Sequence, residues 1–286
     1  MDKSAAGWIN GLIGMAIFSG SLPATKIAMA GFDPLFLTAA RAVIAGLIAV
    51  ALLAALAPRR PDRADIGPLL TVACGVVVGY PLLSAAALNF VTSAHAVVLV
   101  GLLPLTTAVF GVLRAGERPG IAFWVFAAAG SLIIATYALE AGAAAPLGDG
   151  LMLAAVMVCG LGYAEGARLS RRLGGWQVIS WALVLALPLT LPLGLVIMPP
   201  SMADIGWPPL AALAYVSLLS MLLGFVFWYR GLALGGIAAV GQLQLLQPFL
   251  GLLLSALLLH DVVGWPLIAA AAGVAICVAG ARRFAR

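Results

Sequence analysis

Long apolar runs, broken by charged residues, prolines and glycines, repeat along the whole sequence. A run of about 20 predominantly apolar residues is what an α-helix needs to cross the hydrocarbon core of a bilayer. The pattern therefore predicts an all-α, polytopic membrane protein with ten transmembrane helices. They are expected over residues 7–30, 35–57, 67–89, 93–114, 120–140, 149–170, 175–198, 207–230, 236–259 and 263–281.

The composition supports lipid as the solvent for most of this chain. Of its 286 residues, 64% are hydrophobic and only 9% are charged, and the mean hydropathy is +1.16. A soluble domain carries about 25% charged residues, and a disordered chain needs low hydrophobicity and high charge. Both classes are excluded. Ten helices with short loops use roughly 250–290 residues, which leaves no room for a sizeable soluble domain.

The basic residues predict the orientation in the membrane. Thirteen of the 15 lysines and arginines fall on the side that holds the N-terminus, and the other two, Lys26 and Arg41, lie inside predicted helices. Loops on the opposite side carry acids, among them Asp33 and Asp149. By the positive-inside rule, both termini are expected in the cytoplasm.

The two halves of the chain resemble each other. Residues 87–117 align with residues 231–261 at a constant offset of 144, so that Pro104 falls on Pro248 and Glu117 on Asp261. The repeat unit is five helices, an odd number, so the second copy enters the membrane from the other side. The sequence thus predicts two inverted five-helix repeats, residues 1–142 and 143–286, an architecture common among secondary transporters.

Motifs for enzymatic chemistry are absent from the sequence. There is no H-E-x-x-H, G-x-S-x-G or Walker A pattern. The three cysteines, Cys74, Cys159 and Cys277, are isolated in apolar runs and form neither a disulfide framework nor a zinc site. We expect no enzyme, no cofactor, no metal site and no nucleic-acid partner. ATP-driven transport within this chain is excluded.

Polar and aromatic residues at helical spacing are the candidates for substrate binding, because polar groups are costly in lipid and should face protein or water. They predict a central cavity lined by helices one, three, four, six, eight and nine. Its candidate residues are Phe18, Ser21, Tyr80, Ser84, Tyr163, Trp228, Gln242, Gln244 and Gln247. Helix packing is the alternative, above all for the glycines on the same faces, since small residues let backbones approach closely.

Four ionisable residues are possible charge sites, each with a structural alternative. Lys26 and Arg41 could attract substrate carboxylates, or snorkel or pair with Asp33. His95 could be a gating residue or a solvated helix cap. Glu165 could bind a substrate ammonium or a coupling proton, or form an ion pair with a nearby arginine.

Prolines within predicted helices are candidate hinges, because a proline frees a backbone carbonyl and allows a bend. The symmetric pair Pro104 and Pro248 is favoured, with static kinks as the alternative.

Residues around the first two helices also resemble a known signature. The run from Phe18 to Lys26 (Phe-Ser-Gly-Ser-Leu-Pro-Ala-Thr-Lys), then Phe32-Asp-Pro34 and Arg41, resemble the first repeat of the drug/metabolite transporter superfamily, EamA type. In the second repeat Glu165 stands where Lys26 stands in the first, and no arginine mirrors Arg41. Any role for the two cations is therefore confined to the first half.

Within that superfamily the chain resembles bacterial exporters of aromatic amino acids. The resemblance implies a secondary carrier of the bacterial inner membrane that exports aromatic amino acids and similar small metabolites by alternating access. Facilitated efflux is favoured over proton antiport, because few carboxylates lie within the predicted helices. A flippase or exporter of lipidic or drug-like substrates, and a proton antiporter of metabolites, remain the alternatives. The sequence leaves the oligomeric state open.

Overall fold

The computed structural model describes residues 3–56, 60–87, 89–91, 99–139, 145–202, 205–247, 249–250 and 265–285. These residues form helices joined by short turns and contain no strand. The first half contributes α1 (Lys3–Ser19), α2 (Ser21–Ala28), α3 (Pro34–Leu56), α4 (Arg63–Val72), η1 (Ala73–Gly79), α5 (Tyr80–Ala87), α7 (Leu103–Ala115) and α8 (Ile121–Leu139). The second half contributes α9 (Pro146–Leu173), α10 (Gly175–Val196), α11 (Trp207–Ala214), η2 (Tyr215–Gly224), α12 (Phe225–Gly235), α13 (Ile237–Gly241), η3 (Gln242–Leu246) and α15 (Trp265–Phe284).

Six helical segments within the described residues are long and apolar enough to cross a membrane, and they coincide with predicted helices one, two, three, six, seven and eight. Their bounds are Lys3–Thr25, Pro34–Leu56, Arg63–Ala87, Pro146–Leu173, Gly175–Val196 and Trp207–Gly235. Shorter apolar helices, at Leu103–Ala115, Ile121–Thr136 and Ile237–Leu246, fall within predicted helices four, five and nine. The all-helical membrane fold is confirmed. The count of ten stays a prediction, because parts of helices four and nine lie outside the described residues.

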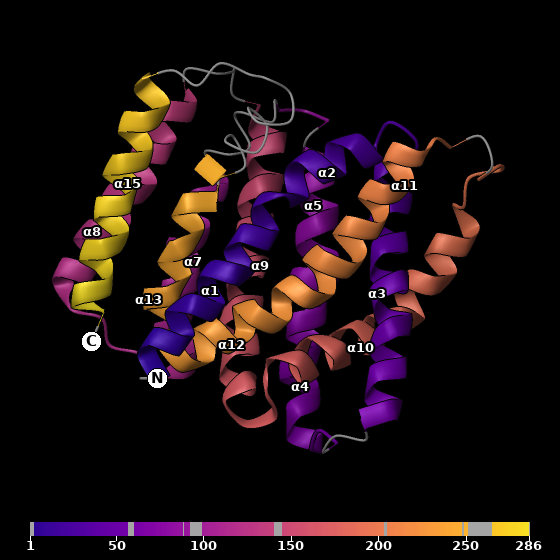
Figure 1. The fold of residues 1–286 in the computed structure, drawn as a ribbon, viewed down its shortest axis with the longest axis horizontal. Helices are drawn as coiled ribbons and strands as arrows, with labels where there is room; N and C mark the ends of the chain where they lie inside the picture. The colour runs from indigo at the N-terminus through magenta and orange to yellow at the C-terminus, as the bar shows by residue number, and fades with distance from the viewer. Residues whose placement is uncertain are drawn as a thin grey trace.

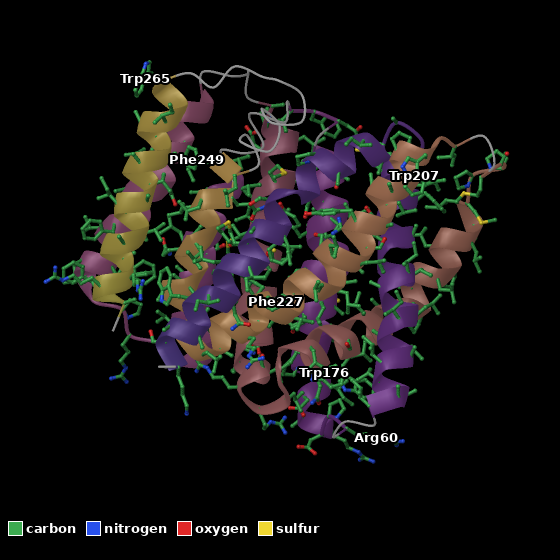
Figure 2. The ribbon with its side chains drawn as sticks, in the orientation of Figure 1. Arg60, Trp176, Trp207, Phe227, Phe249 and Trp265 are labelled. Carbon is green, nitrogen blue, oxygen red and sulfur yellow. The ribbon has the colours of Figure 1, made fainter. Side chains whose placement is uncertain are left out.

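The helices run back and forth between two ends of one bundle (Figure 1). Both chain termini lie at the same end, and Figure 2 places Arg60 at that end, which we call the basic end. Trp207 and Trp265 lie at the opposite end (Figure 2). The turn that holds Arg60 and both termini therefore share one end, as the predicted order of the helices requires.

The two predicted halves are packed against each other rather than separated. Helix α1 packs along α12, and α7 packs along α9. A Cβ added at Gly7 would lie 2.4 Å from the Gly235 nitrogen, and one at Gly231 would lie 2.6 Å from the Gly11 nitrogen. Such approach is possible only without side chains. The packing alternative is thus confirmed for these glycines of α1.

Two helices contain a π-helical segment near their middle. η1 covers residues 73–79, and η2 covers residues 215–224, which includes the positions equivalent to η1 at the offset of 144. Pro81 lacks the N–H that would bond the carbonyl of residue 77 in an α-helix, which accounts for the altered pattern in η1. No comparable proline follows η2. Segments of this kind are often found at functional sites, and Tyr80 and Phe225 directly follow them.

Candidate functional site

Four aromatic side chains from three helices meet in the interior of the bundle. They are Phe18 of α1, Tyr163 of α9, and Phe225 and Trp228 of α12, and each is at most 6% exposed. We call them the central aromatic cluster. The centre of the Phe18 ring lies 4.9 Å from that of Phe225 and 6.0 Å from that of Trp228. The centre of the Tyr163 ring lies 6.0 Å from that of Phe225 and 5.6 Å from that of Trp228.

The cluster brings together three residues that helical spacing had selected, Phe18, Tyr163 and Trp228. Phe225 was missed, because it is apolar and was not among the polar and aromatic positions that helical spacing selected on this helix. Phe225 directly follows η2, and only the π-helical geometry of that segment could have marked it as a candidate.

One polar atom in the cluster has no partner. The indole Nε1 of Trp228 is inaccessible and makes no hydrogen bond, although its ring is completely buried. Neighbouring polar groups are better placed: the Tyr229 hydroxyl donates to the Gly162 carbonyl at 3.3 Å, and the Cys159 thiol lies beside the Tyr163 hydroxyl. Because buried donors are nearly always paired in proteins, the Trp228 N–H is available to an acceptor on a ligand.

Two predicted serines already have hydrogen-bond partners. The Ser21 hydroxyl shares a 2.7 Å hydrogen bond with the Ser220 hydroxyl across the contact of α2 with η2. Ser84 donates to the Pro81 carbonyl of its own helix at 3.2 Å. The Ser84 hydroxyl is left with acceptor capacity only, whereas either hydroxyl can be the donor in the bond between Ser21 and Ser220.

The three glutamines do not share one face. Gln242 is fully buried, and its amide nitrogen donates to the Pro104 carbonyl at 3.5 Å, so it lies in the contact with α7. Gln244 is 6% exposed, and its Oε1 has no partner. Because η3 is a 3₁₀-helix with three residues per turn, Gln247 lies on the same side as Gln244, whereas Gln242 lies on another.

Arg41 occupies an unusual place among the basic residues. It lies within α3, its side chain is partly buried, and its Nε is inaccessible and without a partner. Tyr80 is close enough for the two to interact electrostatically. Arg41 does not form the ion pair with Asp33 that the sequence left open. Asp33 Oδ1 instead accepts hydrogen bonds from the Leu35 and Phe36 amides, at 2.8 and 3.4 Å, and so caps α3.

Glu165 is completely buried and forms ion pairs. One carboxylate oxygen accepts hydrogen bonds from Arg168 Nε and Nη2, at 3.0 and 2.7 Å, and the other accepts one from Arg114 Nε. The interpretation of Glu165 as an ion-pair member is confirmed for Arg168. Arg172 instead pairs with Asp62, at 2.7 Å, and with Asp65.

A second carboxylate at the basic end joins three segments. Glu117, in the turn after α7, accepts hydrogen bonds of 2.7 Å from each of the Ile237 and Ala238 amides at the start of α13. It also pairs with Arg171 of α9 at 2.9 Å. The sequence marked Glu117 only as a landmark of the repeat. Nothing in its local pattern indicates a partner about half a chain away.

Of the two hinge candidates, one can be described. Pro104 lies at the start of α7, directly after a turn at residues 101–102, where its missing N–H is not needed. Ser131 Oγ donates to the Gly101 carbonyl at 2.9 Å and so satisfies it at this break. Pro248 and His95 lie outside the described residues, as does the Lys26 side chain.

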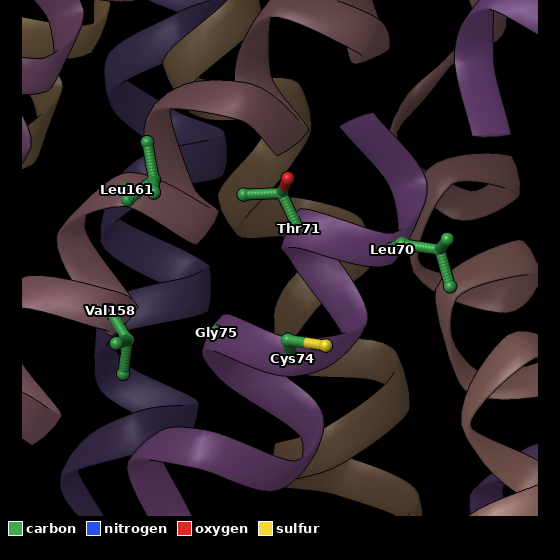
Figure 3. A pocket seen from close by; sticks show the side chains of 6 residues that line it. All are labelled: Leu70, Thr71, Cys74, Gly75, Val158 and Leu161. Atoms are coloured by element: carbon green, nitrogen blue, oxygen red, sulfur yellow. The ribbon is translucent and has the colours of Figure 1, made fainter. Parts of the chain in front are cut away.

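An apolar groove of about 310 Å³ lies apart from these residues, on the surface between α4, η1 and α9 (Figure 3). It is lined by Leu70, Thr71, Cys74, Gly75, Val158 and Leu161. None of the predicted site residues lines it. Among the described residues, no group of three or more His, Cys, Asp or Glu side chains could hold a metal ion.

Comparison with known proteins gives three findings. Residues 5–138 and residues 146–282 each match the model of the EamA-like transporter family. A protein of Bacillus subtilis (strain 168), described as "Uncharacterized transporter YdeK", is 64% identical over 287 residues and is covered over 100% of both chains. A solved structure described only as "Crystal structure of protein" has a TM-score of 0.82 at 22% identity, covering 98% of this chain and 99% of that chain. At that identity the likeness concerns the fold alone.

Proposed function

The chain belongs to the EamA-like transporter family of the drug/metabolite transporter superfamily, and from this premise we propose that it exports aromatic amino acids and similar small metabolites. It is a membrane transporter and not an enzyme, as the sequence predicted. A transporter of this family acts on a small molecule from within a membrane. The export of aromatic amino acids is the narrower part of the proposal, and it follows from the resemblance to exporters of these compounds.

The observation that carries the proposal is the central aromatic cluster. Phe18, Tyr163 and Trp228 come from three helices and present ring faces and edges to one interior region. An aromatic side chain of a substrate gains both buried area and ring contacts in such surroundings. The unpaired Nε1 of Trp228 gives the region a hydrogen-bond donor, and the unpaired Oε1 of Gln244 gives a separate acceptor on η3.

For the architecture we propose ten transmembrane helices in two inverted repeats, residues 1–142 and 143–286, with both termini in the cytoplasm. The family model matches each half separately, which supports the division. The position of η1 and η2 at equivalent places in the two halves supports the internal symmetry. Both termini lie at the same end as Arg60 (Figures 1 and 2), which supports the orientation expected from the positive-inside rule.

Facilitated efflux is the proposed mode of transport. A proton antiporter needs a carboxylate that can exchange its proton within the membrane. In the part of the chain that the structure describes, the buried acids are Asp65 and Glu165, and both are ion-paired with arginine. Arginine side chains occupy both carboxylates, so neither is left without a counter-charge. The carrier then opens its binding site to one side of the membrane and the other in turn, without moving a coupled proton.

The test is efflux from proteoliposomes loaded with labelled phenylalanine or tryptophan, with no energy source. Saturable exit, competed by unlabelled substrate, with the amino acid recovered unchanged by mass, is the expected result. A protonophore that collapses any pH gradient should leave the rate unchanged. Flux no greater than from empty liposomes, with protein shown to be folded, would reject aromatic amino acids as substrates and favour a lipidic or drug-like compound.

A further inference from the structure

Arg41 differs from every other basic residue that the structure describes. The side chains of the others are exposed, whereas Arg41 is partly buried within α3. It lies seven residues after Pro34, where α3 begins at the end opposite the basic end. At a rise of about 1.5 Å per residue this puts it roughly 10 Å along the helix. A cation at such a depth in a membrane helix is costly and usually marks a functional site.

No carboxylate of the described residues neutralises this cation. Asp33 caps α3 through its Oδ1, and the ion pairs of Asp62, Asp65, Glu117 and Glu165 all lie at the basic end. The Nε of Arg41 makes no hydrogen bond. A guanidinium offers five N–H donors in a planar fork that matches a carboxylate. The site therefore has the donors and the charge for a carboxylate, and none of the ion pairs among the described residues includes Arg41.

Tyr80 links Arg41 to the central aromatic cluster. The Tyr80 side chain interacts electrostatically with both Arg41 and Cys159. Cys159 lies beside the Tyr163 hydroxyl, and the Tyr163 ring packs 5.6 Å from that of Trp228. The cation and the rings thus belong to one continuous set of neighbours, with α5 and α9 between them.

We infer that Arg41, assisted by the Tyr80 hydroxyl, binds the carboxylate of the transported substrate while the aromatic cluster receives its side chain. This inference rests on the proposed function, and it adds that the carboxylate is the part of the substrate that Arg41 binds. The carrier then requires a carboxylate and discriminates against amines that have the same ring. The substrate lies with its carboxylate toward α3 and its ring toward α12.

The wild-type protein provides the first test, by inhibition of phenylalanine counterflow in proteoliposomes. We expect 3-phenylpropionate, which keeps the carboxylate, to compete, and phenethylamine, which lacks it, to compete at least tenfold more weakly. Equal competition by the two compounds would overturn the inference. If no flux is measured, thermal stabilisation of the detergent-solubilised protein by 3-phenylpropionate but not by phenethylamine supports it, and stabilisation by neither overturns it.

Arg41→Gln, compared with Arg230→Gln at an exposed arginine, provides the second test. We expect Arg41→Gln to lower kcat/KM for phenylalanine by about 10- to 100-fold, the range for one charge-assisted interaction. Arg41→Lys should restore part of the loss, and Arg230→Gln should change it less than threefold. Unchanged phenylalanine transport by folded Arg41→Gln would overturn the inference and leave the proposed function standing. Arg41-dependent transport of aliphatic carboxylates alone would reject the aromatic substrate and overturn the role of the aromatic cluster, while it would support Arg41 as the carboxylate site.

Discussion

The carboxylate of Glu117 accepts a hydrogen bond of 2.7 Å from the backbone amide of Ile237, 120 residues later in the chain. With its second oxygen on the Ala238 amide, Glu117 occupies the positive end of α13 and satisfies two amides that have no partner within the helix. One side chain of the first half thereby fixes the start of the segment that carries the three glutamines.

Glu117→Gln should therefore destabilise the protein, because the neutral amide offers only one acceptor oxygen and no charge to the helix end or to Arg171. We expect a loss of about 1–3 kcal/mol, measured as a lower Tm in detergent. Arg118→Gln, an exposed change at the adjacent position, is the control and should leave Tm within experimental error. An unchanged Tm in Glu117→Gln would mean that the cap contributes nothing.

The contact of α1 with α12 should be intolerant of any side chain at Gly231. A Cβ there would lie 2.6 Å from the Gly11 nitrogen, so Gly231→Ala has to push the two helices apart. We expect a clear fall in Tm and loss of transport. Gly67→Ala in α4 is the matched control, since a Cβ there meets nothing within 4 Å. That change should stabilise slightly, by up to about 1 kcal/mol.

Glu165→Gln separates an ion-pair role from a coupling role. Its partners Arg114 and Arg168 have side chains that are 50% and 41% exposed, so water can solvate them when the carboxylate is lost. The expected loss of stability is therefore modest, about 1–2 kcal/mol, below the 3–5 kcal/mol of a fully buried broken pair. Efflux should continue and remain insensitive to a pH gradient. Wild-type efflux that depends on a pH gradient, with the dependence lost in Glu165→Gln, would make Glu165 the coupling site.

The apolar pattern was sufficient to predict the membrane helices, because each run of about 20 residues has one solution in a bilayer. Helical spacing also selected Phe18, Tyr163 and Trp228, which the structure brings together. It failed for Glu117, whose partner is an amide far along the chain. For the glutamines, spacing put Gln244 and Gln247 on one face, but it gave no sign that Gln242 contacts the Pro104 carbonyl of α7. Long-range partners and local changes in helix type are set by packing, which single-chain periodicity does not contain.

Trp228→Phe tests whether the unpaired indole N–H serves a ligand. The change keeps an aromatic ring in the cluster and removes a buried donor that has no partner. Removing such a group relieves a cost of about 1–3 kcal/mol, which offsets the smaller ring's lost contacts. We expect a Tm close to wild type and a rise in KM for phenylalanine of about 3- to 10-fold. Trp207→Phe, at a residue that is 77% exposed, should change neither quantity. An unchanged KM in Trp228→Phe would show that this N–H does not bind the substrate.

Accessibility should distinguish Gln244 from Gln242, although both side chains are buried. Gln242 donates to the Pro104 carbonyl in the contact with α7, whereas Gln244 shares the face of Gln247; the Oε1 of each glutamine has no partner. After Cys74, Cys159 and Cys277 are replaced, Gln244→Cys should react with a small water-soluble thiol reagent, and saturating phenylalanine should slow the reaction. Gln242→Cys, two residues away, should stay unreactive. If both cysteines react alike, η3 does not present one face to the transport pathway; if neither reacts with or without substrate, Gln244 belongs to the helix packing. Slowing at Gln244 alone would place substrate along the side of η3 that Gln244 and Gln247 share.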